Sequence, residues 1–298
     1  MAFNGNGCKK DMKLPVSAIV LTYNEEKKIE ECLRSLEGWV DEIFIVDSFS
    51  SDRTVEMSRR YTRHIYQHPF ENYGIQRNWA QANLPIRNEW IFHLDADERV
   101  MPELINALKG KFRYNLSPID GYLISRQTVF MGRWIKHGGH YPAYHLRIFR
   151  KHSGRCEDRL YDQHFIVNGN LAILDGDIID TVTSDIGRWF KGLKRWAILE
   201  ALEATRHPEG LQLAAKKHGN CLEKKRWLRQ RYYKLPIFVR PILYFLYRYF
   251  FKCGFLDGIK GLLFHAVQGL WYRWLVDRHI FFIWAARKYH RIMKLSSA

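Results

Sequence analysis

Four short apolar runs in the first hundred residues, alternating with helix-like segments, constrain the fold more than any other feature of the sequence. The runs are residues 16–22, 42–47, 64–67 and 90–97. The segments with helical character are residues 25–36, the stretch after 48–52, residues 74–83 and a segment that starts near Pro102. Strand–helix alternation of this kind predicts an α/β fold with a mainly parallel sheet and helices on both faces. Ligands are then expected at the carboxyl ends of the strands.

The pattern changes after residue 120. Residues 121–132 and 144–151 have the character of strands joined by a loop rich in Gly and His, and residues 184–205 that of a helix. Helical segments follow, with expected breaks at Pro236, Pro241, Gly254 and Gly269. We therefore divide the chain into an α/β domain at residues 14–220 and a helical appendage at residues 221–298.

The helical appendage is strongly basic and aromatic. Residues 221–298 contain 16 Lys and Arg against 3 Asp and Glu, a net charge of +13 out of +16 for the whole chain. Segments such as PILYFLYRYFF resemble helices that lie in a membrane interface, with rings at headgroup level and cations on anionic lipid. We expect this basic surface to be separate from the function of the first two thirds. A helical core, a dimer surface or a nucleic-acid surface are the alternatives, but no nucleic-acid reading motif is present.

The expected absence of a secretory signal and of a membrane-spanning run, together with the scattered cysteines, suits a protein that is at most peripheral to a membrane. The N-terminus lacks the apolar stretch of a secretory signal, and no run reaches 18 uncharged apolar residues. The five cysteines are scattered, without a C-x-x-C pair. Such a set is typical of reduced thiols in a cytosolic compartment.

Two carboxylates, Asp95 and Asp97, end the fourth apolar run. Residues two apart on a strand point to the same side, so both side chains are expected to aim at one point beyond the sheet edge. Mg²⁺ or Mn²⁺ prefers such oxygen ligands and bridges to phosphates, and it would remove the repulsion between the two charges. The alternative is that the two acids cap the following helix.

Polar residues also follow the first two strands. Thr22, Tyr23, Asn24 and Glu25 come after the first strand, and Asp47 ends the second. Groups in these positions can hold a ribose or a base edge, although Glu25 and Asp47 serve equally well as helix caps. The sequence contains no G-x-G-x-x-G and no G-x-x-x-x-G-K motif, which argues against a dinucleotide oxidoreductase and a P-loop enzyme.

The order of these motifs resembles the family 2 glycosyltransferases. The matching set is Thr22-Tyr23-Asn24-Glu25, then VDSFSSDRT at 46–54, Gln76-Arg77-Asn78 and LDADE at 94–98. The likeness covers roughly residues 15–205 and is greatest to lipopolysaccharide-core β-1,4-glucosyltransferases and exopolysaccharide glycosyltransferases. It implies an A-type nucleotide-sugar-binding fold and inversion at the anomeric carbon. It also implies that Tyr23, Glu25, Asp47 and Arg77 contact the nucleotide, and that Asp95 and Asp97 engage a divalent metal and the diphosphate.

An inverting transfer needs a carboxylate that accepts the proton of the attacking hydroxyl. The family's pattern has Val-His-Glu where this chain has Tyr161-Asp162-Gln163, and an amide cannot act as a base. We therefore place the base at Asp162, with Asp158 and Glu157 in reserve. Ion pairs of the two reserve acids with Arg155 or Arg159 are an equally good interpretation.

The loop at residues 133–142 occupies the place where such enzymes receive the acceptor. Its aromatic rings suit a sugar ring, and its glycines permit close approach; the acceptor-side residues are Trp134, His137, His140 and Tyr141. His137, His140 and His145 lack the further ligand that would complete a zinc site.

The resemblance and the charge pattern together predict a metal-dependent inverting glycosyltransferase at the cytoplasmic face of the inner membrane. Residues 14–220 would form the catalytic domain and residues 221–298 a membrane-associating region. The donor would be a nucleotide-diphosphate sugar, and the acceptor a lipid-linked glycan or lipopolysaccharide core, with no role for nucleic acid. The alternatives are transfer to a polyprenyl phosphate and a noncatalytic membrane-associated scaffold that has lost its base.

Overall fold

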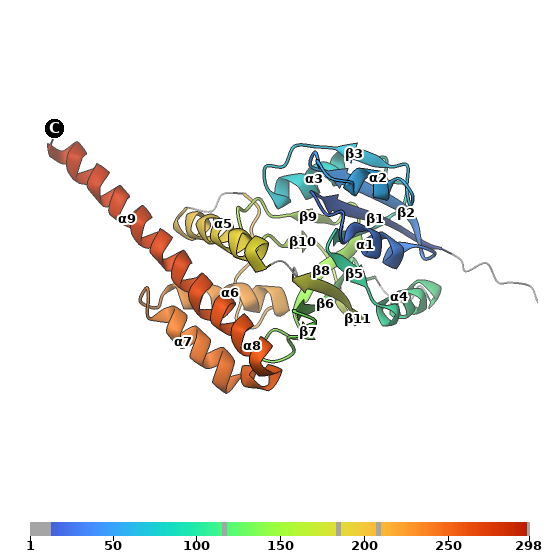
Figure 1. Ribbon diagram of the computed structural model, residues 1–298. Coiled ribbons are helices and arrows are strands. Elements are labelled where there is room, and N and C mark those ends of the chain that lie inside the picture. The colour runs from blue at the N-terminus through green and yellow to red at the C-terminus, as the bar shows by residue number, and fades with distance from the viewer. Residues whose placement is uncertain (1–12, 115–117, 183–185, 207–209, 297–298) are drawn as a thin grey trace, which may run out of the picture.

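A mixed nine-stranded sheet forms the centre of the protein (Figure 1). The computed structural model describes residues 13–114, 118–182, 186–206 and 210–296. The strands of the sheet are β1 (Leu14–Thr22), β2 (Val40–Asp47), β3 (Ile65–Gln67), β4 (Trp90–Asp95), β5 (Glu98–Val100), β6 (Gly121–Phe130), β7 (Arg133–Trp134), β8 (Tyr144–Arg150) and β11 (Leu171–Val182). A separate antiparallel pair is formed by β9 (Gly154–Cys156) and β10 (Phe165–Val167).

The strand order is β3-β2-β1-β4-β8-β6-β11-β5, with β7 paired to β6. The first half, β3 to β4, is parallel throughout, and the antiparallel strand β8 joins it to β6 and β11, which are parallel to each other. Because the carboxyl ends of β1, β2 and β4 meet at one edge, the polar residues that follow them are brought together.

Helices cover the sheet on both faces, which explains why β1 is almost continuously apolar. The helices of the first two thirds are α1 (Ile29–Leu36), α2 (Thr54–Ser58), α3 (Tyr73–Asn83), α4 (Pro102–Tyr114) and α5 (Ile186–Thr205). One hydrophobic cluster contains Val20, Leu33 and Leu104, and another contains Ile19, Phe44 and Phe149, so successive residues of β1 face opposite cores.

The turn after β4 differs from the expected long strand. β4 ends at Asp95, Asp97 lies in a turn, and the short strand β5 runs antiparallel to β11 before α4 begins at Pro102. Pairing of Glu98 with Asp180 in this ladder forces the turn. The prediction that Asp95 and Asp97 lie two apart on one strand is therefore wrong. The interpretation as caps of α4 is wrong too, because β5 intervenes.

The C-terminal third is helical. Its elements are α6 (Cys221–Tyr233), α7 (Arg240–Leu246), η1 (Tyr247–Phe251), η2 (Gly254–Asp257), α8 (Gly258–His265), η3 (Ala266–Trp271) and α9 (Tyr272–Ser296). Breaks occur near Pro236 and Gly254 as expected, and Pro241 lies in the first turn of α7. Gly269 does not break the helix: it lies buried within η3, where an added Cβ would make only ordinary contacts with Tyr244 and Phe245.

These helices share a hydrophobic core with the α/β domain. The ring of Phe130, at the end of β6, lies 4.9 Å from Trp189 of α5 and 5.4 Å from Phe264 of α8. Helix α9 is in contact with α5, and Figure 1 shows α9 continuing beyond it, away from the body of the protein. The predicted fold class, an α/β sheet with flanking helices and a C-terminal helical region, is confirmed.

Two further expectations concern the thiols and the membrane. Cys32, Cys156, Cys221 and Cys253 are free thiols, whereas Cys8 and the N-terminal segment assessed for a signal lie outside the described residues. In the part of the chain that the structure describes, no helix has both the length and the apolar character needed to cross a bilayer.

Candidate active site

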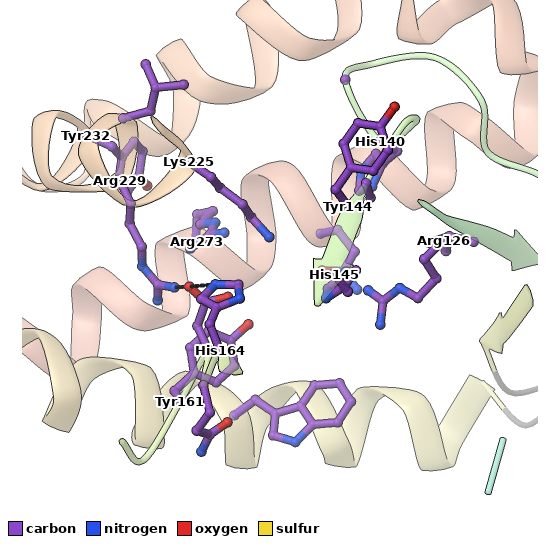
Figure 2. Close-up of a pocket in the computed structure, with 18 of the residues that line it drawn as sticks. Arg126, His140, Tyr144, His145, Tyr161, His164, Lys225, Arg229, Tyr232 and Arg273 are labelled. Carbon is purple, nitrogen blue, oxygen red and sulfur yellow. Dashed lines mark hydrogen bonds and ion pairs between the residues drawn. The ribbon is translucent and has the colours of Figure 1, made fainter. Parts of the chain in front are cut away.

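A large cavity lies between the sheet and the C-terminal helices. Its volume is about 1380 Å³, and its lining includes Asp95, the last residue of β4. Figure 2 shows that one wall comes from the sheet, with Arg126, Tyr144 and His145. The opposite wall comes from the helices, with residues such as Lys225 and Arg229. The cavity therefore joins the strand-end motifs to the basic tail.

Asp95 is held between two arginines. Its carboxylate accepts hydrogen bonds from Arg77 at 2.9 and 3.2 Å and from Arg147 at 3.0 Å, and Arg147 also binds Glu98 at 2.6 Å. Burial alone would raise the pKa of Asp95, but Arg147 and Arg77 hold that pKa well below its usual value. Arg77, expected at the nucleotide, thus makes its ion pair with Asp95 and packs over the rings of Tyr73 and Phe165.

Asp97 is in the opposite electrostatic situation. Its side chain is 38% exposed, and the nearest cation is the Lys28 ammonium at 3.7 Å. Partial burial and the charge of Asp180 raise the pKa of Asp97 well above its usual value, and Lys28 offsets this only in part. Excess negative charge at an accessible carboxylate is what a divalent cation neutralises.

The donor set fits a metal that is completed by substrate. No group of three or more His, Cys, Asp or Glu side chains among the described residues is placed to hold a metal ion. Mg²⁺ commonly uses one or two carboxylates together with substrate phosphates and water rather than a protein cage. Asp97 fits this role, whereas both oxygens of Asp95 already accept hydrogen bonds from arginine.

The residues after β1 and β2 have two different functions in the structure. Asp47 is fully buried and accepts hydrogen bonds from Thr22 Oγ1 and the Ser50 amide, both at 2.9 Å. The Asn24 side chain accepts a hydrogen bond from the Ser51 amide at 2.8 Å. Thr22, Asn24 and Asp47 therefore tie the two strand-end loops together, without capping α1 or α2.

Tyr23 and Glu25 present their side chains outward from these loops. Tyr23 is 59% exposed. Partial burial raises the pKa of Glu25, and the positive charge of Lys28 opposes this increase without cancelling it. The Glu25 carboxylate accepts no hydrogen bond from the described residues, so it is free to meet a ligand group.

The three candidate bases occupy different environments. Asp162 lines the cavity, in the left-handed backbone region at φ 57°, and its Oδ2 is bound by Arg229 with His164 Nε2 at 3.6 Å. Burial would raise the pKa of Asp162, but Arg229 and His164 hold it well below its usual value. Asp158 is exposed outside the cavity lining and is contacted by Asn72 at 3.4 Å.

Glu157 is unavailable for catalysis. It is fully buried, and its two oxygens accept hydrogen bonds from Arg226 at 2.8 Å and from the amides of His164 and Leu213, both at 2.9 Å. These contacts argue against Glu157 as a reserve base. A buried carboxylate with this many donors is a structural anchor for α6.

Only His140 of the four acceptor-side residues lines the cavity. His137 instead binds Asp257 through Nδ1 at 2.7 Å and through its amide at 3.0 Å, which docks the loop on η2. Trp134 and Tyr141 pack edge to face with ring centroids 5.0 Å apart, and the Tyr141 hydroxyl donates to Asp177 at 3.2 Å. Trp134, His137 and Tyr141 therefore lie outside the lining of this cavity, and the acceptor-side function of the four residues stays a prediction.

The cations of the tail are the residues that sequence reasoning missed. Lys225, Arg229, Arg248 and Arg273 line the same cavity as Asp95, so the expectation of a separate basic surface is wrong. The four-residue spacing of Lys225 and Arg229 puts both on one face of a helix. This spacing is the feature of the sequence that could have indicated a shared basic face. It did not reveal what that face covers.

Glu200 of α5 anchors this wall. It is fully buried, and it accepts hydrogen bonds from Arg229 at 2.7 Å, from Arg273 at 2.6 Å and from the hydroxyls of Tyr233 and Tyr272, both at 2.6 Å. Burial would raise the pKa of Glu200, but Arg273 and Arg229 hold it below its usual value. One carboxylate thus fixes α6 and α9 against α5.

A comparison with protein families decides the identity of this fold. Residues 17–178 match the family described as Glycosyl transferase family 2. This chain belongs to that family. The resemblance seen in the motifs is confirmed, and the protein, as a glycosyltransferase, is an enzyme.

The glycosyltransferase is similar to proteins from several bacteria. It is 28% identical to the lipopolysaccharide core biosynthesis glycosyltransferase LpsC of Rhizobium meliloti, over 90% of this chain and 93% of LpsC. It is 34% identical to an uncharacterized glycosyltransferase of Rickettsia bellii, over 33% of this chain and 32% of that protein. Among solved structures, residues 1–349 of S. aureus TarS in complex with UDP-GlcNAc align with a TM-score of 0.45 and 15% identity, covering 90% of this chain and 89% of TarS.

Replacing Glu200 by Gln tests the anchor of the cavity wall. We expect Glu200→Gln to lower the free energy of unfolding at pH 7 by about 3–5 kcal/mol, because two arginines lose a buried partner. The folded pKa of Glu200 is lowered, so its contribution is complete above the unfolded pKa of about 4.3 and is lost as the pH falls through the folded pKa. Urea unfolding at pH 7 and at pH 3.5 measures the difference.

The matched control is Glu103→Gln, at an exposed glutamate of α4. It should change stability by no more than about 0.5 kcal/mol. Equal stabilities of Glu200→Gln and Glu103→Gln at pH 7 would contradict the anchoring function of Glu200.

Proposed function

We propose that this glycosyltransferase moves a sugar, with inversion, from a nucleotide-diphosphate donor to a lipid-linked glycan of the lipopolysaccharide-core type. The observation that supports it most is the shared cavity, in which Asp95, at the end of β4, and a basic wall from the C-terminal helices line the same space. The similarity to LpsC, a lipopolysaccharide core biosynthesis glycosyltransferase, extends over both parts of this cavity.

On the donor side, Tyr23 and Glu25 are the proposed nucleotide contacts, because their side chains are free while Thr22, Asn24 and Asp47 hold the loops. Asp97 is the proposed ligand of Mg²⁺ or Mn²⁺. Such a cation stabilises the charge of the departing nucleoside diphosphate. Arg77 and Arg147 position Asp95 next to Asp97 and contribute positive charge at the same edge.

On the acceptor side, Asp162 is the proposed general base. Its Oδ1 accepts no hydrogen bond from the described residues, while Arg229 holds Oδ2 and so orients the carboxylate. Its lowered pKa keeps the group ionised at neutral pH, which a general base requires, while the ion pair with Arg229 lowers its basicity. Asp162 lines the same cavity as Asp95, as transfer between the two substrates requires.

The end of the molecule formed by η1, η2 and the start of α8 is the proposed membrane contact. These elements touch one another and carry exposed apolar side chains, of which Phe251 is 80% and Ile259 77% exposed. Lys252 and Lys260 are exposed beside them. Rings and aliphatic groups flanked by cations suit the interface of an anionic bilayer, and this contact would place the enzyme on the cytoplasmic face of the inner membrane.

Asp97→Asn tests the metal assignment. We expect donor hydrolysis and sugar transfer to fall at least about 100-fold, because metal stabilisation of the leaving group is worth several kcal/mol. A panel of nucleotide sugars with added Mn²⁺, followed by mass analysis of lipid products, measures both reactions. Asp175→Asn, at an exposed aspartate of β11, is the control. Unchanged turnover and unchanged response to Mn²⁺ in Asp97→Asn would refute the assignment.

Asp162→Asn tests the base. Transfer should fall by about 10²- to 10⁴-fold, the usual contribution of general base catalysis, while the affinity for the donor nucleotide stays the same. Asp158→Asn is a close control, because Asp158 is an exposed acid outside the cavity lining. A severe loss in Asp158→Asn beside a near-normal Asp162→Asn would reverse the order of the two candidates.

Flotation with vesicles tests the membrane contact. The intact chain should float with vesicles rich in phosphatidylglycerol at low salt, and much less with neutral vesicles or at high salt, where charges are screened. The double variant Phe251→Ser/Ile259→Ser should lose flotation, whereas Ile173→Ser, an exposed site on β11, should keep it. Failure of the intact chain to float with anionic lipid at low salt would end the membrane proposal.

A further inference from the structure

The cavity carries far more positive than negative charge. Its lining contains 12 Lys and Arg against 3 Asp and Glu. Several of these cations have carboxylate partners: Asp95 binds Arg77 and Arg147, and the buried Asp277 binds Arg240. Glu200 binds Arg229 and Arg273, and Arg126 lies within ion-pair distance of Glu98 and Asp180. Cations that repel each other inside an enclosed space are costly unless an anion joins them. The remaining cations therefore indicate what this space binds.

Three cations of the helical wall, Lys225, Arg248 and Lys252, have no carboxylate within ion-pair distance among the described residues. Arg248 donates to the Gly138 carbonyl and, at 2.6 Å, to the Tyr244 hydroxyl, and the Lys252 ammonium lies 5.8 Å from the centre of the Tyr247 ring. Lys225 extends from α6 into the cavity, between the His164 and Arg229 side and the His145 and Arg126 side (Figure 2).

Arg248 and Lys252 of the helical wall lie close to the loop of residues 138–140. Gly138 adopts φ 67°, and an added Cβ there would lie 2.1 Å from His265, so only glycine lets the loop pack against the helices. The Gly138 amide donates to the Lys252 carbonyl at 2.9 Å. Loop and helical wall are thus fixed relative to each other, which gives the cluster a defined geometry.

The histidines beside the cluster are buried in cationic surroundings. Burial and then Arg248 lower the pKa of His140 well below its usual value. Burial and then Arg126 and Lys225 do the same for His145. Both rings are therefore neutral at pH 7, and the His140 Nε2 is buried with no hydrogen-bond partner among the described residues. The site offers cations together with neutral groups that can donate hydrogen bonds, which suits an oxyanion.

We propose that Lys225 and Arg248 bind a phosphate or carboxylate group carried by the acceptor. Arg126 of β6, which lies 3.7 Å from Glu98 and 3.5 Å from Asp180, contributes positive charge from the sheet side. This inference rests on the proposed function for the acceptor itself. Asp162 is the strongest charged neighbour of Lys225. The bound anion therefore lies next to the proposed base, and so next to the hydroxyl that is glycosylated. The substrate class is then an acidic, lipid-linked glycan rather than a neutral one.

The first experiment measures binding without any reaction. Inorganic phosphate is titrated into the intact protein by calorimetry. We expect Lys225→Gln to weaken phosphate binding at least about tenfold, because a charge-assisted contact is lost. Lys224→Gln is the matched control, since Lys224 is exposed on the same helix outside the cavity lining. Binding should persist in Asp97→Asn, which separates this site from the donor side. Equal affinities in Lys225→Gln and Lys224→Gln, or an adventitious ion only, would overturn the proposal.

The second experiment identifies the source of the anion. Lipid-linked acceptor is used intact, after phosphatase treatment, or after amidation of its carboxylates. One of the two treatments should raise the acceptor KM of the unchanged protein about tenfold or more, and Lys225→Gln should not respond to that treatment. An unchanged KM after both treatments would overturn the proposal. Donor hydrolysis by the unchanged protein tests the proposed function alone, so its absence is distinguishable from failure of the anion site.

Discussion

The buried carboxylate of Glu200 is the interaction on which the cavity depends. It receives two arginines and two tyrosine hydroxyls from α6 and α9, so that three helices meet at one charge. A fully buried carboxylate is tolerable only when its hydrogen bonds are satisfied, and these four donors satisfy it. Arg229 then spans from Glu200 to Asp162, so the anchor of the wall also orients the proposed base.

A second network at the sheet edge follows the same principle. Asp95 is held by Arg77 from α3 and Arg147 from β8, and Arg147 is held in turn by Glu98 from β5. The carboxylates inside the two networks are paired with arginines. The groups left outside them, Asp97 on one side and Lys225 on the other, are the ones free to bind substrate. This division is the basis on which we propose the donor at the sheet edge and an acidic acceptor at the helical wall.

Local patterns predict the first half of this protein well, because apolar runs and helix periodicity record burial along β1 to β4 directly. The family is evident from motifs such as LDADE, whose spacing is local too. Features set by distant partners were missed: the turn at Asp97 depends on pairing of β5 with β11, and the burial of Glu157 depends on Arg226. The basic tail was detected as charge, but its position opposite Asp95 follows from packing around Phe264, which no local pattern encodes.

The central claim is that the C-terminal helices and the strand ends form one active cavity in this glycosyltransferase. A crystal structure of the intact chain with UDP and Mn²⁺ tests it most directly. We expect the diphosphate and Mn²⁺ at Asp97, with the open side of the nucleotide facing the wall that carries Lys225 and Arg229. Nucleotide bound away from Asp97, or helices displaced so that Lys225 and Arg229 no longer face the strand ends, would contradict it.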